Sequence, residues 1–211
     1  MKMLLCTFLK RKNAFILCSL ALILPSLLIS REQERDILLE FKAAYFQPTG
    51  SLFRHIYGGS ALFGPEVTFK LKNQWYGFAS VDYLTKNGKS LGLRTSTHVN
   101  LLPLGIGLKY LWCMNDYSQF YAGLGFQPVY VMLENCSPYV AKNQNKWGFG
   151  GIAKIGAFVD LPHHFFLDFF VDYSFVKVPF KNSVVPAGYV QPHKANVSGA
   201  IFGAGVGYRF N

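Results

Sequence analysis

The stretch VSGAIFGAGVGYRF, residues 197–210 of a 211-residue chain, decides the fold class. Its even positions from Ala200 to Phe210 are apolar, whereas glycines and Arg209 occupy most of the odd positions. Strict alternation over this length indicates a β-strand whose two faces meet different surroundings. A strand of about ten residues, tilted by about 45°, crosses a bilayer. The large apolar face then suits lipid, and the small glycine face suits the interior of a narrow barrel.

The start of the chain has the pattern of an export signal. Basic residues between positions 2 and 12 precede an apolar run over residues 14–29, and a charged segment follows at 31–36. The run is shorter than the ~20 residues that a membrane helix needs, and Pro25 interrupts it. We therefore interpret residues 1–30 as a signal peptide and residues 31–211 as the mature domain. The alternative is an uncleaved membrane helix.

The rest of the chain alternates with a period of two residues. Glycine, lysine and aspartate interrupt its apolar stretches, which a barrel strand tolerates and a membrane helix does not. The alternation predicts eight strands, over residues 37–46, 61–72, 75–84, 98–112, 119–133, 147–161, 164–177 and 197–210. Pro103 either splits the fourth strand or marks a bulge within it. Since bacterial single-chain barrels have even strand counts, we keep one strand.

The fold class is therefore all-β, an eight-stranded antiparallel up-and-down transmembrane β-barrel. The predicted connections alternate between short turns near residues 73, 113 and 162 and long loops near residues 47, 85, 134 and 179, with a turn at Lys86–Lys89. Long loops face outward and short turns face the periplasm, so both termini lie in the periplasm. A soluble sandwich or lipocalin-like barrel is the alternative, but it would place rows of glycine on the solvent face.

Charged side chains recur on the face that the barrel turns inward. They comprise six acids and six bases: Glu40, Glu66, Asp82, Asp160, Asp168, Asp172, Lys42, Lys70, Lys72, Lys109, Lys154 and Arg209. Buried charges persist only when they are paired or hydrated, and eight strands leave little room beyond side chains. We expect a salt-bridged plug with small water pockets. This network either gates a narrow pore or simply pairs structurally.

The predicted outer loops are basic, and the whole chain has a formal net charge of +10. Their basic residues are Arg54, Lys86, Lys89, Arg94, Lys142, Lys146, Lys181 and Lys194. Lysine and arginine bind phosphate, so packing against lipopolysaccharide is one interpretation. Binding of an acidic host glycan or a host protein is another. Nucleic acid is not expected as a partner of an exported protein.

Catalysis and metal binding are not expected. A hydrolase site would need histidine, serine and a carboxylate on adjoining strands, and the surroundings of His98 do not supply that pattern. His163 and His164 are adjacent, so on a strand they point to opposite faces. We therefore expect no enzyme activity, cofactor or metal. Cys113 and Cys136 flank the fifth predicted strand, too far apart for a mutual disulfide.

Several short motifs resemble the small eight-stranded outer membrane proteins, most closely the outer membrane protein W family and its OmpA-like relatives. The motifs are LLPL at 101–104, KYLW at 109–112, YAGLG at 121–125, WG at 147–148 and GYRF at 207–210. The resemblance implies an outer membrane protein that passes small, often hydrophobic molecules. It also implies that the barrel assembly machinery reads Tyr208 and Phe210. We expect a monomer or weak oligomer, with Trp75, Trp112 and Trp147 anchoring the membrane interfaces.

Overall fold

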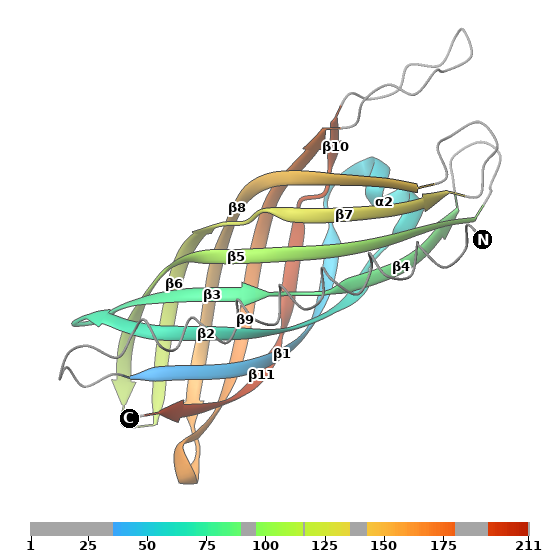
Figure 1. Ribbon diagram of the computed structural model, residues 1–211. Helices are drawn as coiled ribbons and strands as arrows, with labels where there is room; N and C mark the ends of the chain where they lie inside the picture. The colour runs from blue at the N-terminus through green and yellow to red at the C-terminus, as the bar shows by residue number, and fades with distance from the viewer. Residues whose placement is uncertain (1–35, 90–95, 116, 136–142, 180–193, 211) are drawn as a thin grey trace, which may run out of the picture. The chain divides into compact units, whose positions relative to one another are not determined.

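The computed structural model describes residues 36–89, 96–115, 117–135, 143–179 and 194–210, and the predicted signal peptide lies outside them. The elements are β1 (Ile37–Pro48), α2 (Ser51–Tyr57), β2 (Ser60–Lys72), β3 (Trp75–Val81), β4 (Leu84–Lys89), β5 (Ser96–Asn115), β6 (Ser118–Phe126), β7 (Val129–Asn135), β8 (Asn143–Asp160), the 3-10 turn η2 (Pro162–His164), β9 (Phe165–Pro179), β10 (Lys194–Asn196) and β11 (Gly199–Phe210) (Figure 1). Within these residues, no helix has the length and apolar character to span a membrane.

The strands close into a barrel because the first pairs with the last. β1 and β11 are antiparallel from Ile37 opposite Phe210 to Pro48 opposite Gly199. Antiparallel pairing continues through β2, β3, β5, β6, β8 and β9 back to β11. The ring of described strands therefore has eight positions, which confirms the predicted fold class. Within this ring of described strands, closure pairs both edges of each strand, as a sheet in a membrane requires.

Two of the predicted strands are interrupted. The third breaks at Asp82 and Tyr83, between β3 and β4, where the Asp82 amide donates to the carbonyl of Pro103 at 2.9 Å. The fifth breaks at Gln127 and Pro128, between β6 and β7, because proline lacks a ladder donor. Pro103 itself lies within one continuous β5 and pairs with Val129. The choice of a single fourth strand is thus confirmed.

At one end of the barrel, the strands continue into residues that the sequence predicted to be loops. The predicted turn at Lys86–Lys89 is wrong, because these residues belong to β4 and pair with β5 as far as Lys89 opposite Ser96. Likewise, β8 already begins at Asn143, so Lys146 is a strand residue. Lys194 lies in β10, paired with Pro179. The predicted loop after residue 47 contains helix α2.

The two ends of the barrel differ. Short turns join β2 to β3 at Asn73 and β8 to β9 at η2, where His163 and His164 have positive φ angles of 65°. The C-terminus lies at this end in Figure 1, and α2, β4, β7 and β10 lie at the other. We call these the turn end and the helix end. This agrees with the predicted alternation of short and long connections.

Side chains alternate between the lumen and the exterior as predicted. On β1, Glu40 and Lys42 are each 3% exposed, whereas the intervening Phe41 is 55% exposed. The exterior also carries aromatic residues near both ends. Tyr110 contacts Trp75 and Trp112 in edge geometry toward the turn end, and Tyr130 contacts Trp147 toward the helix end. Such paired aromatic girdles flank the lipid-facing band of membrane barrels.

Glycine on the inner face of β11 is required by close packing, which gives a test of the fold. A Cβ on Gly207 would lie 2.3 Å from Cζ of Phe166 and 2.6 Å from the carbonyl oxygen of Leu39. We expect Gly207→Val to lower the free energy of unfolding by about 1–3 kcal/mol through overpacking. Urea unfolding of the barrel refolded in vesicles measures it. Ala204→Val, on the exposed face of the same strand, is the matched control and should unfold like the wild type.

Candidate functional site: the filled lumen

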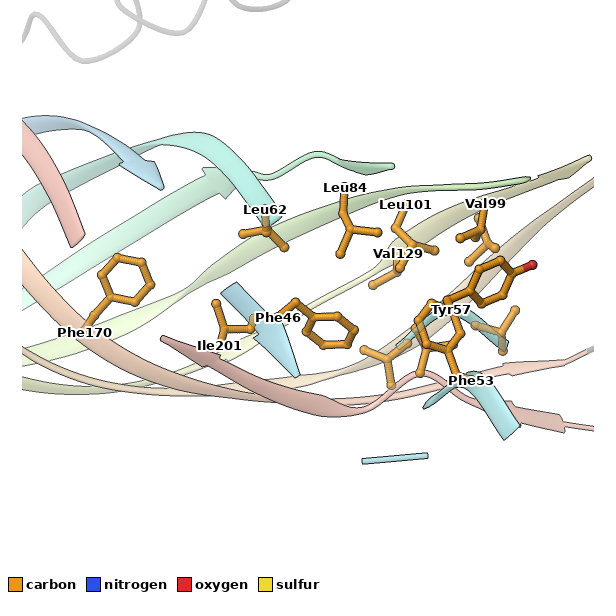
Figure 2. Packing of buried hydrophobic residues seen from close by; sticks show 14 of the residues in the cluster. Phe46, Phe53, Tyr57, Leu62, Leu84, Val99, Leu101, Val129, Phe170 and Ile201 are labelled. Atoms are coloured by element: carbon orange, nitrogen blue, oxygen red, sulfur yellow. The ribbon is translucent and has the colours of Figure 1, made fainter. Parts of the chain in front are cut away.

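The helix end of the lumen is apolar and is covered by α2. Figure 2 shows Phe46, Leu62, Leu84, Leu101, Val129 and Ile201 pointing toward one another between the strands, with Phe53 and Tyr57 of α2 beyond them. The Phe53 ring lies 6.3 Å from Phe46 and 4.9 Å from Tyr57. Burial raises the pKa of the Tyr57 hydroxyl, so this group stays neutral. An apolar plug therefore closes this end.

A cavity of about 20 Å³ lies within this apolar layer. Most of its lining is apolar, including Leu62, Leu84 and Leu101, and Gln127 and Ser174 add polar groups. Ser174 donates a hydrogen bond to Oε1 of Gln127. The volume is about that of one water molecule, so this cavity is not a conduit.

The centre of the lumen is an ion cluster built around Glu66 of β2. Lys42 and Lys109 both form ion pairs with its carboxylate, and Nζ of Lys154 lies 3.1 Å from Oε2. Lys154 also donates to Oδ2 of Asp172 at 2.7 Å. All five side chains are at most 3% exposed. One carboxylate therefore holds three ammonium groups together inside the barrel.

Aromatic rings form the other side of each lysine site. Nζ of Lys109 lies 4.3 Å from the ring centre of Tyr121 and 5.3 Å from that of Phe158. Lys42 lies over Phe170, and Lys154 lies over Phe78. Such cation–π contacts stabilise desolvated lysines. These rings were not predicted from the sequence, although Phe170 occupies an inward position between Asp168 and Asp172 in the alternation.

The remaining central carboxyl groups are less well paired. Asp168 accepts a hydrogen bond from the hydroxyl of Tyr121 at 3.0 Å. Oε1 of Glu40 lies 3.8 Å from Nζ of Lys109, and Asp82 is 4% exposed. Within the described residues, Asp82 forms no ion pair within 4.0 Å. The central layer thus holds five carboxyl groups and three lysines, so the expected balance of acids and bases is wrong.

A second polar cluster closes the turn end. The Arg209 guanidinium donates to Asp160 at 3.1 Å and to Gln119 at 3.2 Å, while Asp36 accepts a hydrogen bond from Tyr76 at 2.9 Å. Arg209 and Asp160 therefore pair with each other in a cluster that is separate from that of Glu66. The side chains come from five strands or strand ends, and they join the start of β1 and the end of β11 to the barrel wall.

Lys70 and Lys72 do not belong to the lumen network. Both are exposed at the end of β2, where the ladder with β3 is irregular between the two lysines. At Lys70, β2 has already passed the mouth of the barrel. Both lysines lie on the face of the strand that points inward, but no lumen surrounds them here. The prediction that they face the lumen is wrong.

The basic residues of the helix end are only partly described. Arg54 on α2 and Lys89 on β4 are exposed, whereas Lys86 and Lys146 are half-buried. For Lys194 the backbone alone is described, and Arg94, Lys142 and Lys181 lie outside the described residues. The structure therefore places Arg54 and Lys89 on neighbouring elements of one barrel end (Figure 1).

His98 forms contacts between neighbouring strands on the barrel exterior. Its Nδ1 lies 2.6 Å from Oδ1 of Asn87, and its Nε2 lies 3.2 Å from Oγ1 of Thr85. These contacts join β5 to β4. The partners of His98 are thus a threonine and an asparagine, not the serine and carboxylate of a hydrolase site. Cys113 is exposed near the turn end of β5, and Cys136 lies outside the described residues.

Comparisons with known proteins agree on the class of fold. No family model and no curated protein matches the chain. Among solved structures, the outer membrane protein OprG from Pseudomonas aeruginosa matches with 17% identity and a TM-score of 0.63, over 83% of this chain and 96% of that one. Outer membrane protein W of E. coli matches with 14% identity and a TM-score of 0.53, over 85% and 100%.

A third match is Ail, the attachment invasion locus protein of Yersinia pestis, in complex with the heparin analogue sucrose octasulfate. It has 13% identity and a TM-score of 0.54, over 84% of this chain and 100% of that one. The chain therefore has the fold of the small outer membrane β-barrel proteins of bacteria. This confirms the fold expected from the resemblance to outer membrane protein W.

The central position of Glu66 predicts a large stability effect. Glu66→Gln keeps the side-chain volume but leaves three buried ammonium groups without their shared carboxylate. We expect the free energy of unfolding to fall by about 3–5 kcal/mol. Urea unfolding in vesicles, followed by tryptophan fluorescence, measures it. Glu134→Gln, at an exposed position on β7, is the control, and an equal loss in both variants would contradict the role assigned to Glu66.

Proposed function

We propose that this protein is an integral outer membrane barrel that is closed at rest and opens as a narrow pore when the ion pairs of Glu66 exchange partners. The observation that carries the proposal is the bridging of Lys42, Lys109 and Lys154 by one buried carboxylate. A cluster of this kind blocks the centre of the lumen without any loop or domain. Lys154 already contacts a second carboxylate, that of Asp172 at 2.7 Å, so it can leave Glu66 without becoming unpaired.

The proposed placement in the membrane follows the asymmetry of the barrel. The helix end faces outward toward lipopolysaccharide, and the turn end with both termini faces the periplasm. Tyr208 and Phe210 on β11 form part of the exterior at the turn end, with ring centres 4.8 Å apart. We propose that the barrel assembly machinery reads these two residues and that the barrel works as a monomer or weak oligomer.

Conductance in planar bilayers tests the gate. We expect the wild type to be closed most of the time, and Lys109→Ala and Asp168→Ala to open more often, because each removes a partner from the cluster. The openings should stay rare and brief, since α2 and the apolar layer at the helix end must also be displaced before ions can pass. Lys70→Ala, outside the lumen, is the control.

Two results would contradict the gate. Steady wild-type conductance would mean that the filled lumen is not the resting state in lipid. Unchanged ion flow in both lumen variants would mean that the cluster pairs charges for stability alone, which leaves a structural envelope protein. Heat-dependent gel mobility confirms in each case that the variant is folded.

A second candidate function is the binding of an acidic glycan at the helix end. Arg54 and Lys89 are exposed there, and the similar barrel Ail was solved with a heparin analogue. Exposed lysine and arginine bind sulfate and phosphate groups through charge-assisted hydrogen bonds. A host glycan or lipopolysaccharide supplies such groups.

Binding of heparin to the barrel in vesicles tests this second function. Each of Arg54→Gln and Lys89→Gln should weaken binding by roughly fivefold or less, the effect of about 1 kcal/mol that an exposed ion pair contributes. Moderate salt should weaken wild-type binding as well. Lys70→Gln at the turn end should have no effect. Salt-independent binding, or equal losses in all three variants, would exclude a basic glycan site at the helix end.

A further inference from the structure

The central layer of the lumen has more acids than bases. Its carboxyl groups are Glu40, Glu66, Asp82, Asp168 and Asp172, and its ammonium groups are Lys42, Lys109 and Lys154. None of these eight side chains is more than 4% exposed. If every group were ionised, five negative charges would face three positive charges, an excess of two. Buried charge without a partner is strongly unfavourable, so two further positive charges are needed.

The closest ion pairs of the three lysines involve two of the five carboxylates. All three pair with Glu66, and Lys154 pairs with Asp172 as well. Asp168 is stabilised by the hydroxyl of Tyr121. The carboxyl groups left with the poorest partners are therefore those of Glu40 and Asp82.

Glu40 is buried without a hydrogen-bond partner. Both of its carboxyl oxygens lack one, and Lys109, with which it forms its single ion pair among the described residues, is at 3.8 Å. Its Oε2 lies over Gly205 of β11, 3.0 Å from where a Cβ would be, and Gly205 is paired with Asp168. The Oδ1 of Asp168 is likewise buried without a hydrogen-bond partner. Two carboxyl groups in one buried site can form a hydrogen bond with each other only when one of them carries a proton.

Asp82 lies in the break between β3 and β4. Its Oδ1 is buried without a hydrogen-bond partner. The break brings this oxygen close to Gly64 of β2, where a Cβ would lie 2.7 Å away. Asp82 is therefore held in the wall of the lumen at a point where no ammonium group of the described residues reaches it within 4.0 Å.

The charged groups around these two carboxyls come from five strands. The groups that act on Glu40 are Lys42 of β1, Glu66 of β2, Lys109 of β5 and Asp168 of β9, and β11 opposes it with Gly205 and Gly207. Those that act on Asp82 are Lys42, Glu66, Lys154 of β8 and Asp172 of β9. Each site combines acids and lysines, and the lysines are shared with Glu66.

We propose that Glu40 and Asp82 are proton-binding sites that are occupied in the closed barrel at neutral pH. The cluster then contains three ammonium groups and the three carboxylates of Glu66, Asp168 and Asp172, and its net charge is zero. Each of the two protons neutralises a carboxyl group whose Oε1 or Oδ1 is buried without a hydrogen-bond partner. Within the described residues, no group of three or more potential ligand side chains is placed to hold a metal ion, so the missing positive charge is assigned to protons. This goes beyond the proposed gate and does not require that the barrel conducts.

Infrared spectroscopy of the refolded protein in vesicles tests the proposal directly. At neutral pH, solvent-exposed carboxyl groups are ionised, so a carbonyl band of a protonated carboxyl that shifts in D₂O reports buried protons. We expect this band in the wild type, a smaller band in Glu40→Gln and in Asp82→Asn, and none in the double variant. Glu134→Gln should keep the full band. Absence of the band from the wild type, or an unchanged band in both single variants, would overturn the assignment.

Unfolding measurements provide a second, independent test. Glutamine and asparagine mimic the protonated carboxyls, so Glu40→Gln and Asp82→Asn should keep wild-type urea midpoints at neutral pH, whereas Asp172→Asn should have a lower midpoint. The folded wild type would bind more protons than the unfolded chain, so its midpoint should fall as pH rises above neutral. The double variant should lose this fall. A large midpoint drop in Glu40→Gln at neutral pH would mean that Glu40 is ionised and would contradict the proposal.

Replacement of sodium and potassium ions by choline at constant ionic strength separates protons from a bound metal cation. We expect the urea midpoint of the wild type to be unchanged. A lower midpoint in choline that is absent from the double variant would show that a metal cation neutralises the two carboxyls, and the proton assignment would be wrong.

Discussion

The packing of three lysines around Glu66 is the interaction on which the rest of the lumen depends. It needs space near the barrel axis, and glycine supplies that space. A Cβ on Gly123 would lie 3.0 Å from Cγ of Lys109, and one on Gly205 would lie 3.1 Å from Cγ of Lys42. Long charged side chains on one strand are thus accommodated by glycine on its neighbour. The glycine face of the last strand is a requirement of the ion cluster as well as of a narrow barrel.

The layers on either side of the cluster determine how strongly its charges interact. The Phe158 ring lies next to Lys109, and the Phe166 ring packs against Phe158 with centres 5.2 Å apart. Aliphatic side chains and α2 fill the helix end. In surroundings from which water is largely excluded, ion pairs attract more strongly, and an unpaired charge costs correspondingly more. Closure of the barrel and charge pairing therefore reinforce each other.

Alternation along the strands was sufficient to predict the fold class, because one face of each strand contacts lipid and the other contacts the lumen. The same alternation placed Glu40, Lys42, Glu66, Lys109 and Lys154 inside the barrel. It did not reveal where a strand leaves the membrane, so Lys70 and Lys72 were assigned to the lumen and Lys86 to a turn. Nor did it show which charges pair, since partners such as Glu66 and Lys154 meet across the lumen from strands that are not adjacent.

Polar contacts close the turn end of the lumen, and apolar packing closes the helix end. A single substitution therefore does not open both ends. Arg209 bridges Asp160 and Gln119 at the turn end through half-buried polar contacts that water can replace. At the helix end, Phe53 and Tyr57 bury apolar surface, which water does not replace without a free-energy cost. If the Glu66 pairs exchange as proposed, the centre of the barrel therefore opens toward the turn end more readily than toward the helix end. A continuous path also requires displacement of α2 and the apolar layer beneath it.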